Sequence, residues 1–210
     1  MPNMMVKILA QRFLWAITGI AFLCVVTTAS AQRPPSERLR GTVESIDRSK
    51  LTLKAGDSRT INVTLTSDVR VTAIVKASFA DIKEGSYIGS GAMPQADGSQ
   101  KAVEVHIFTE SQRGTGDGHR PWDGAAGGTM TNGEAGNIVT GVQGLTLTVK
   151  YKDGEKKLIV TPDTPIVRYE LADKRDLQPG ASVSINAIKK PDGSLEAPRV
   201  SILRGGAAPD

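Results

Sequence analysis

The residues best suited to chemistry lie in one glycine-rich segment in the middle of the chain. Residues 111–133 read SQRGTGDGHRPWDGAAGGTMTNG, with seven glycines. Within this segment, an imidazole, a guanidinium, an indole and a carboxylate lie within five positions. Tryptophan and arginine often anchor interfaces, so we predict a docking element for a partner or ligand, formed by His119, Arg120, Trp122 and Asp123. The alternative is that Trp122 packs against a neighbouring barrel and only fixes the segment.

The same segment also contains a possible metal site. Asp117, His119 and Asp123 would supply two carboxylates and one imidazole. Structural zinc sites use four nitrogen or sulfur ligands, whereas the whole chain has two histidines and one cysteine. A hard cation needs about six oxygen ligands. We therefore predict no metal and no cofactor, and keep these three residues as the candidates if a metal binds.

The sequence contains no recognisable catalytic pattern. It has no G-x-S-x-G nucleophile motif. The glycines of 124–128 lack the lysine and the strand-to-helix context of a phosphate-binding loop. The other histidine, His106, is predicted to face solvent from the polar side of a strand. We therefore expect a protein that is not an enzyme.

The first 31 residues have the three parts of a secretory signal peptide. Lys7 and Arg12 precede an apolar run over 13–26, and small residues follow up to Ala31. The run has 14 residues, whereas a membrane-spanning helix needs about 20. We predict cleavage after Ala31 and a periplasmic or extracellular protein that meets the membrane only through this segment. One short apolar run does not support a membrane permease.

Cleavage changes the charge balance of the chain. The mature protein loses its only cysteine and two of its 26 basic residues, which leaves a formal net charge of +2. Disulfides are thereby excluded. Single-stranded nucleic acid is bound by basic grooves with stacking aromatic residues, and aromatic residues make up only 4% of the chain. We therefore predict no nucleic-acid partner.

One pattern occurs twice in the mature chain. Gly41-Thr42-Val43 recurs as Gly136-Asn137-Ile138, 95 positions later, and residues 81–85 match 176–180 at the same offset. A spacing that stays constant along the chain indicates an internal repeat. We predict the signal peptide over 1–31, β-barrel repeat 1 over 38–110, a flexible Gly-rich linker over 111–133, β-barrel repeat 2 over 134–204 and a tail over 205–210.

Each repeat shows the alternation that is typical of strands. Ile61, Val63 and Leu65 alternate with polar residues, and Asp-Gly turns separate such runs. About five short strands in a unit of this size bury their edges best by closing into a barrel. We predict an all-β protein of two tandem small OB-like β-barrels, and the alternative for each unit is a small sandwich.

The repeats also resemble a known family. The first unit contains G-T-V-x-S-I-D, L-T-L, D-I-K-E-G-S and D-G-S, and the second contains D-L-Q-P-G-A and P-D-G-S-L-E-A-P-R-V-S-I. These patterns are similar to those of the bacterial secreted domain-of-unknown-function family 5666. The resemblance covers most of the mature chain and implies an OB-like β-barrel outside the cytoplasm. It implies no chemistry, because the matching residues are turn and packing signals.

Together these observations predict a non-catalytic binding or scaffold protein of the bacterial cell envelope. Its partner is expected to be an envelope protein or a glycan. The alternative is a small-ligand or metal-ion binding protein, with its site in a barrel groove or at residues 117–123.

Overall fold

The computed structural model describes residues 36–142 and 144–207 of the 210-residue chain. The predicted signal peptide over 1–31 and the last three residues of the predicted tail lie outside this part. Among the described residues, no helix has the length and apolar character needed to cross a membrane.

The prediction of an all-β protein is confirmed. The described residues form twelve strands and three short 3-10 helices. The strands are β1 (Ser36–Asp47), β2 (Lys50–Ala55), β3 (Thr60–Lys76), β4 (Tyr87–Pro94), β5 (Gln100–Ile107), β6 (Gly118–Pro121), β7 (Thr129–Gly141), β8 (Gly144–Tyr151), β9 (Gly154–Val160), β10 (Ile166–Leu171), β11 (Ser182–Lys189) and β12 (Leu195–Leu203). The helices are η1 (Phe79–Asp81), η2 (Glu110–Gln112) and η3 (Lys174–Asp176).

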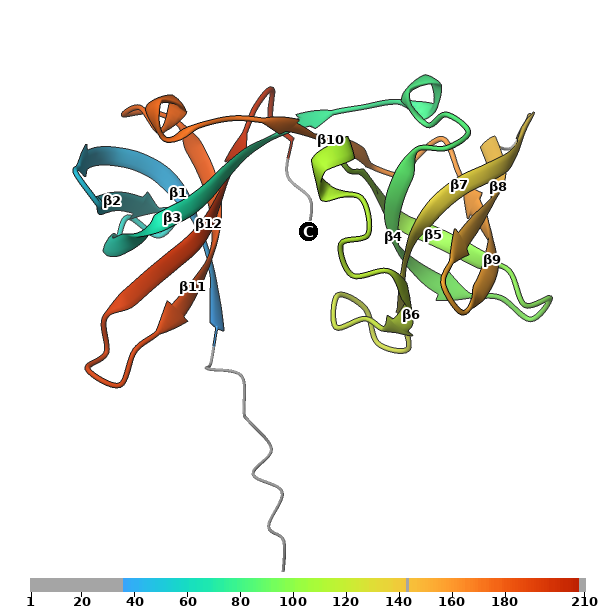
Figure 1. Ribbon diagram of the computed structural model, residues 1–210, viewed down its shortest axis with the longest axis horizontal. Coiled ribbons are helices and arrows are strands. Elements are labelled where there is room, and N and C mark those ends of the chain that lie inside the picture. Colours follow the sequence, from blue (N-terminus) through green and yellow to red (C-terminus); the bar gives the residue numbers. More distant parts are fainter. Residues whose placement is uncertain (1–35, 143, 208–210) are drawn as a thin grey trace, which may run out of the picture. The chain divides into compact units, whose positions relative to one another are not determined.

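Five strands from the two ends of the described chain close into a barrel, called here the first ring. β1 pairs with β2 and β11, β2 pairs with β3, and β11 pairs with β12. A parallel pairing of β12 with β3 closes the ring. Figure 1 shows the blue β1 and β2 beside the red and orange β11 and β12. The alternating apolar residues of these strands form one core, which includes Leu51, Leu53, Val63, Ile185 and Val200.

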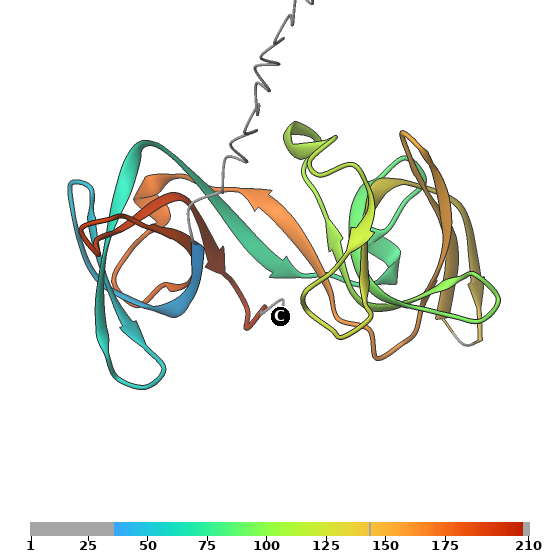
Figure 2. The ribbon, with the colours of Figure 1, turned by 90° about the horizontal axis from the view of Figure 1, so that it is seen from below.

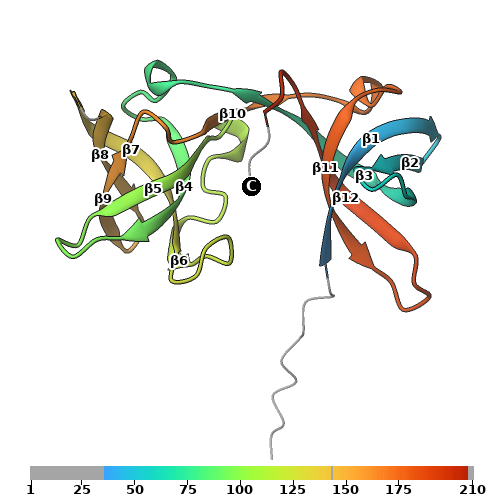
Figure 3. The same ribbon diagram turned by 180° about the vertical axis from the view of Figure 1, so that it is seen from behind.

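Strands from the middle of the chain close a second ring. β7 pairs with β8 and β4, β8 pairs with β9, and β4 pairs with β5. A short parallel contact of Gln100–Lys101 with Leu158–Ile159 joins β5 to β9. Figure 3 shows the green β4 and β5 beside the yellow and orange β7, β8 and β9. The core of this ring includes Ile88, Val105, Leu147, Val149 and Leu158.

These pairings differ from the expected domain boundaries. Residues 38–110 were expected to close into one barrel and residues 134–204 into another. Instead, β1, β2 and β3 share a core with β11 and β12, while β4 and β5 share a core with β7, β8 and β9. The reason is that equivalent strands of the two halves carry the same alternation, so the sequence pattern does not specify which copy a strand pairs with.

An antiparallel pairing between β3 and β10 connects the two rings. Its central pair is Ile74 and Tyr169, which are 95 residues apart. The two flanking parallel pairings are equivalent at the same offset. Val71 pairs with Val200 in one, and Ile166 pairs with Val105 in the other. Ile166 is 95 residues after Val71, and Val200 is 95 residues after Val105. Figure 2 shows β3 and β10 side by side. The strand register therefore relates the two halves of the chain by a local two-fold arrangement. Its centre is the β3–β10 pair, called here the ribbon.

The segment 111–133, predicted as a Gly-rich linker outside both repeats, contributes strands to the second ring's sheet. The segment contains the last residues of η2, all of β6 and the first residues of β7. β6 pairs with β7 from Gly118 opposite Asn132 to Pro121 opposite Thr129. Its glycines serve turns rather than mobility: Gly114 and Gly116 have φ values of 84° and 60°, which side chains with a Cβ rarely adopt.

The strand pairing predicts which fragments fold. Residues 77–166 contain all strands of the second ring, whereas residues 38–110 contain strands of both rings and complete neither. We expect the 77–166 fragment to unfold cooperatively on heating and the 38–110 fragment to show no cooperative transition as a monomer. Circular dichroism melting with analytical ultracentrifugation tests this. A monomeric 38–110 fragment that melts cooperatively, beside an unfolded 77–166 fragment, would show that each repeat closes on itself.

Candidate functional site

Trp122, one of the predicted docking residues, packs on the second ring. Its indole covers Gly91 of β4, where a Cβ would lie 2.6 Å from the ring, and it also covers Gly124 and Gly128 of its own loop. Its backbone N–H donates to the carbonyl of Gly128 at 3.0 Å. The ring is half-buried. This is the packing arrangement that stood as the alternative to docking.

The other candidates of the segment do not converge on one point. His119 is bonded through Nδ1 to the hydroxyl of Thr131 at 2.8 Å. Arg120 donates to the carbonyl of Gly116 at 2.8 Å, and Asp123 is exposed. Over the described part of the chain, no group of three or more His, Cys, Asp or Glu side chains could hold a metal ion.

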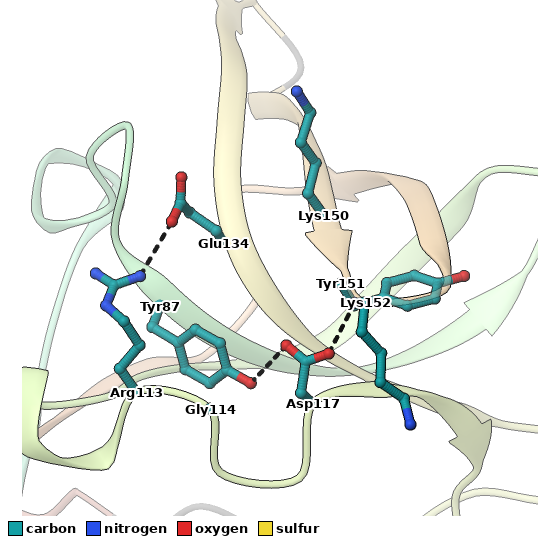
Figure 4. A pocket seen from close by; sticks show the side chains of 8 residues that line it. All are labelled: Tyr87, Arg113, Gly114, Asp117, Glu134, Lys150, Tyr151 and Lys152. Carbon is teal, nitrogen blue, oxygen red and sulfur yellow. Dashed lines mark hydrogen bonds and ion pairs between the residues drawn. The ribbon is translucent and has the colours of Figure 1, made fainter.

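Asp117 belongs to a separate shallow pocket of about 460 Å³, shown in Figure 4. Its carboxylate accepts hydrogen bonds from the Tyr87 hydroxyl at 3.1 Å and from the backbone N–H of Lys152 at 2.9 Å. Burial, and next the hydrogen bond to Asp117, raise the pKa of Tyr87 to about 12, so the phenol stays protonated. Asp117 thus ties the loop before β6 to the turn after β8.

Arg113 completes this Asp117 pocket and is fully engaged there. It bonds Glu134 at 3.1 Å and the carbonyl of Gly85 at 2.8 Å, and its guanidinium lies 5.8 Å from the centre of the Tyr87 ring. In Figure 4, Arg113 and Glu134 point toward one another, while Lys150 extends away from Asp117. Because the central charges are already paired, the pocket fastens the fold better than it receives a ligand.

A larger groove lies along β3 and β10, and sequence reasoning missed it. This cavity, called here the β3 groove, measures about 620 Å³, a size typical of small-molecule sites. One wall comes from outward-facing residues of the first ring: Arg38, Thr72, Ser184, Asn186, Arg199 and Ser201. The other comes from β5, the loop that follows it and β10, with His106, Phe108, Gln112, Thr115 and Tyr169.

Strand alternation explains the polar wall. Val71, Ala73 and Val200 are buried in the first ring or beside it, so Thr72 and Ser201 point to the opposite face. Ser201 is opposite Ser184 on one side and Thr72 on the other. The hydroxyls of Thr72 and Ser201 lie 3.3 Å apart. A row of hydroxyl groups therefore crosses three strands.

The same wall carries an unbalanced positive charge. Arg70 of β3 lies directly opposite Arg199 of β12, and like charges at opposed positions destabilise a sheet. Both side chains are exposed and line the groove. Among the described residues, none of the ion pairs includes Arg38, Arg70 or Arg199. The lining carboxylate, Asp173, is paired with Arg175 at 2.7 Å.

The opposite wall is a series of aromatic rings. Phe108 stacks on Tyr169 with centroids 5.4 Å apart and planes inclined by 10°. His106 meets Tyr169 edge-on at 5.9 Å, and Tyr87 packs against Phe108 at 5.7 Å. Of these three pairs, only Phe108 and Tyr169 turn their faces toward one another.

The expectation that His106 faces solvent is wrong. Its side chain is only 15% exposed, and its Nε2 lies 3.3 Å from a carboxylate oxygen of Glu104, whose side chain is 5% exposed. The two atoms are close but not aligned for a hydrogen bond. β10 lies beside β5, with His106 opposite Val167, and the Tyr169 ring packs on the imidazole. Burial, followed by the nearby charge of Glu104, raises the pKa of Tyr169.

The packing of Trp122 predicts the effect of a single methyl group. Gly91→Ala places a Cβ against the indole, so we expect a loss of about 1–3 kcal/mol in the free energy of unfolding and a shifted tryptophan emission. The chain contains two tryptophans, and residues 32–210 contain only Trp122. Gly136→Ala is the control, because a Cβ there meets nothing within 4 Å. Urea unfolding followed by fluorescence measures both, and equal effects of the two variants would contradict the packing.

His119 predicts a pH dependence of stability. Burial, and next the charge of Lys156, lower its pKa from the ordinary value of 6.5. The unfolded state therefore binds a proton first, and the stability from the neutral ring is lost as the pH falls through 6.5 toward the lower folded-state value. We expect the stability of the His119→Asn variant to fall less steeply than wild type between about pH 7 and pH 5. Urea midpoints across this range measure the difference, and parallel curves would contradict it.

Comparison with known proteins adds no relative. No family model matches the chain, and neither a curated protein nor a solved structure matches it. The function must therefore be argued from the described side chains.

Proposed function

We propose that this chain is a non-catalytic binding protein of the bacterial cell envelope and that the β3 groove is its binding site. The proposal keeps the predicted signal peptide, which would deliver residues 32–210 to the periplasm or the exterior. It includes two OB-like barrels that arose by tandem duplication. The constant 95-residue offset between equivalent strand pairs supports the duplication. The closure of five strands into each ring, with one parallel pair in each, supports an OB-like barrel.

The observation that carries the proposal is the opposed pair Arg70 and Arg199 at the groove. The pair costs the free protein stability through repulsion, and a bound anion removes that cost by accepting hydrogen bonds from both guanidinium groups. Arg38 adds a third positive charge to the same wall. These charges favour a ligand that carries negative charge.

The corresponding face of the second ring supports the same conclusion. Ser184 and Asn186 line the groove, and the residues 95 positions earlier are Gly89 and Gly91. A Cβ at Gly89 would lie 3.0 Å from the Phe108 ring, and one at Gly91 would meet Trp122. The chain covers this face itself in the second ring, whereas the first ring leaves the equivalent face open. We therefore assign binding to the β3 groove rather than to His119–Asp123.

A titration of the mature protein with host envelope extract tests the site. Residues 32–210, labelled with 15N, are titrated with the polar fraction of the extract, and amide shifts are followed by NMR. We expect changes concentrated at Thr72, Tyr169 and Ser201. Ser201→Phe fills the groove and should abolish them, while Thr60→Phe, at an exposed position of β3 outside the groove, should not. Shifts confined to other surfaces, or none at all, would refute the assignment.

A further inference from the structure

The chemistry of the two walls narrows the class of ligand. Resting on the proposed function, we infer that the β3 groove takes an acidic carbohydrate, an oligosaccharide that carries carboxylates and free hydroxyls. Its carboxylates bind the arginines, and its hydroxyls bind the polar row of the first ring.

The arginines form a row of positive charge across the polar wall. Arg70 and Arg199 are opposed in the β3–β12 pair. Arg38 of β1 is opposite Asn186 of β11, and the neighbouring Ile185 is opposite Val200, so Arg38 lies at about the same level as Arg199. Neighbouring strands are about 4.8 Å apart, so the row extends over about 14 Å of sheet from β1 to β3. A ligand that contacts the whole row is longer than a single carboxylic acid and carries more than one negative charge.

The polar row selects for hydroxyl groups. Thr72, Ser184 and Ser201 each offer one donor and two acceptor positions, and Asn186 offers both kinds of group. A sugar hydroxyl also donates and accepts, so it can satisfy these groups in either direction. A chain of phosphodiesters or of carboxylates alone supplies acceptors only.

The aromatic wall argues against stacked bases. Phe108 and Tyr169 stack on each other, and His106 packs edge-on against Tyr169. Sequence-tolerant binding of single strands needs open ring faces on which bases stack. The stacked faces of Phe108 and Tyr169 are therefore closed to a base. This packing disfavours a ligand that binds by stacking of its bases.

Calorimetric titration of residues 32–210 tests the ligand class. The probes are an oligomer of galacturonic acid, the neutral galactose oligomer of equal length, a single-stranded DNA oligonucleotide and a polyglutamate peptide. We expect binding of the galacturonate oligomer and at least tenfold weaker binding of the other three at the same ionic strength. DNA or polyglutamate that binds as tightly as the galacturonate oligomer, or equal binding of the neutral oligomer, would overturn the acidic-carbohydrate assignment.

Paired variants separate the groove from general charge attraction. The double variant Arg70→Gln/Arg199→Gln should bind the galacturonate oligomer about 10- to 100-fold more weakly, the cost of losing charge-assisted hydrogen bonds. Lys54→Gln/Lys101→Gln removes the same charge from exposed positions outside the groove and should leave the affinity within about twofold. Equal losses in both variants would contradict a site at the arginines.

Thermal unfolding gives a second readout that does not depend on the choice of sugar. Without ligand, Arg70→Gln should raise the melting temperature because it removes the repulsion with Arg199, and the Lys54→Gln control should not. A lower melting temperature for Arg70→Gln would contradict the unbalanced pair. If the galacturonate oligomer fails to bind while envelope extract still shifts Thr72 and Ser201, the ligand class is wrong and the binding site stands. If the extract also leaves the groove unchanged, the proposed function fails as well.

Discussion

The antiparallel pairing of β3 with β10 is the interaction on which the rest of the structure depends. It is centred on Ile74 and Tyr169 and continues for two pairs on each side. The same segments also pair in parallel with β12 and β5, so each ribbon strand is held on both edges. Ile74, Val167 and Ala207 form a small core of their own at this place. The ribbon is therefore packed as well as hydrogen-bonded.

This pairing also creates the β3 groove. The polar wall comes from outward-facing residues of β3, β11 and β12, and the aromatic wall comes from Phe108 and Tyr169. Tyr169 of this pairing packs on the imidazole of His106, which lies beside the buried carboxylate of Glu104. Burying that carboxylate and opposing two arginines both cost stability. The interior of each ring, built from alternating Val, Leu and Ile, supplies the apolar burial that offsets such costs.

Much of the fold could be predicted from the sequence, because it follows from the two-residue alternation of apolar side chains and from the residues that form turns. The alternation around Val63 and Leu65 and the Asp-Gly turns predict strands, and strands are present. The choice of partner strands could not be predicted. β1 pairs with β11 rather than with β4, the strand that lies 95 residues earlier at the equivalent place in the first half. Which of two equivalent strands becomes the partner depends on the segments that connect the strands. The most important of these is β3, which is 17 residues long.

The candidate site was harder to predict for the same reason. Residues that stand together in sequence, such as Asp117 and Asp123, suggest a site by proximity, yet the structure uses Asp117 to hold a turn. The groove is assembled from residues spread between Arg38 and Ser201, and its signal in the sequence is a set of isolated arginines and hydroxyls. His106 was misplaced because its cover, Tyr169, comes from the other half of the chain.

The two halves share a scaffold but differ where the groove is formed. The 95-residue offset relates Glu104 to Arg199 and His106 to Ser201. On one strand the offset positions hold a buried acid and an imidazole, and on the other an exposed base and a hydroxyl. The equivalent of Arg70 is Pro165, which carries no charge. A symmetric arrangement of strands thus presents one open positive wall instead of two, because the positions equivalent to Arg70 and Arg199 hold Pro165 and Glu104 in the other half.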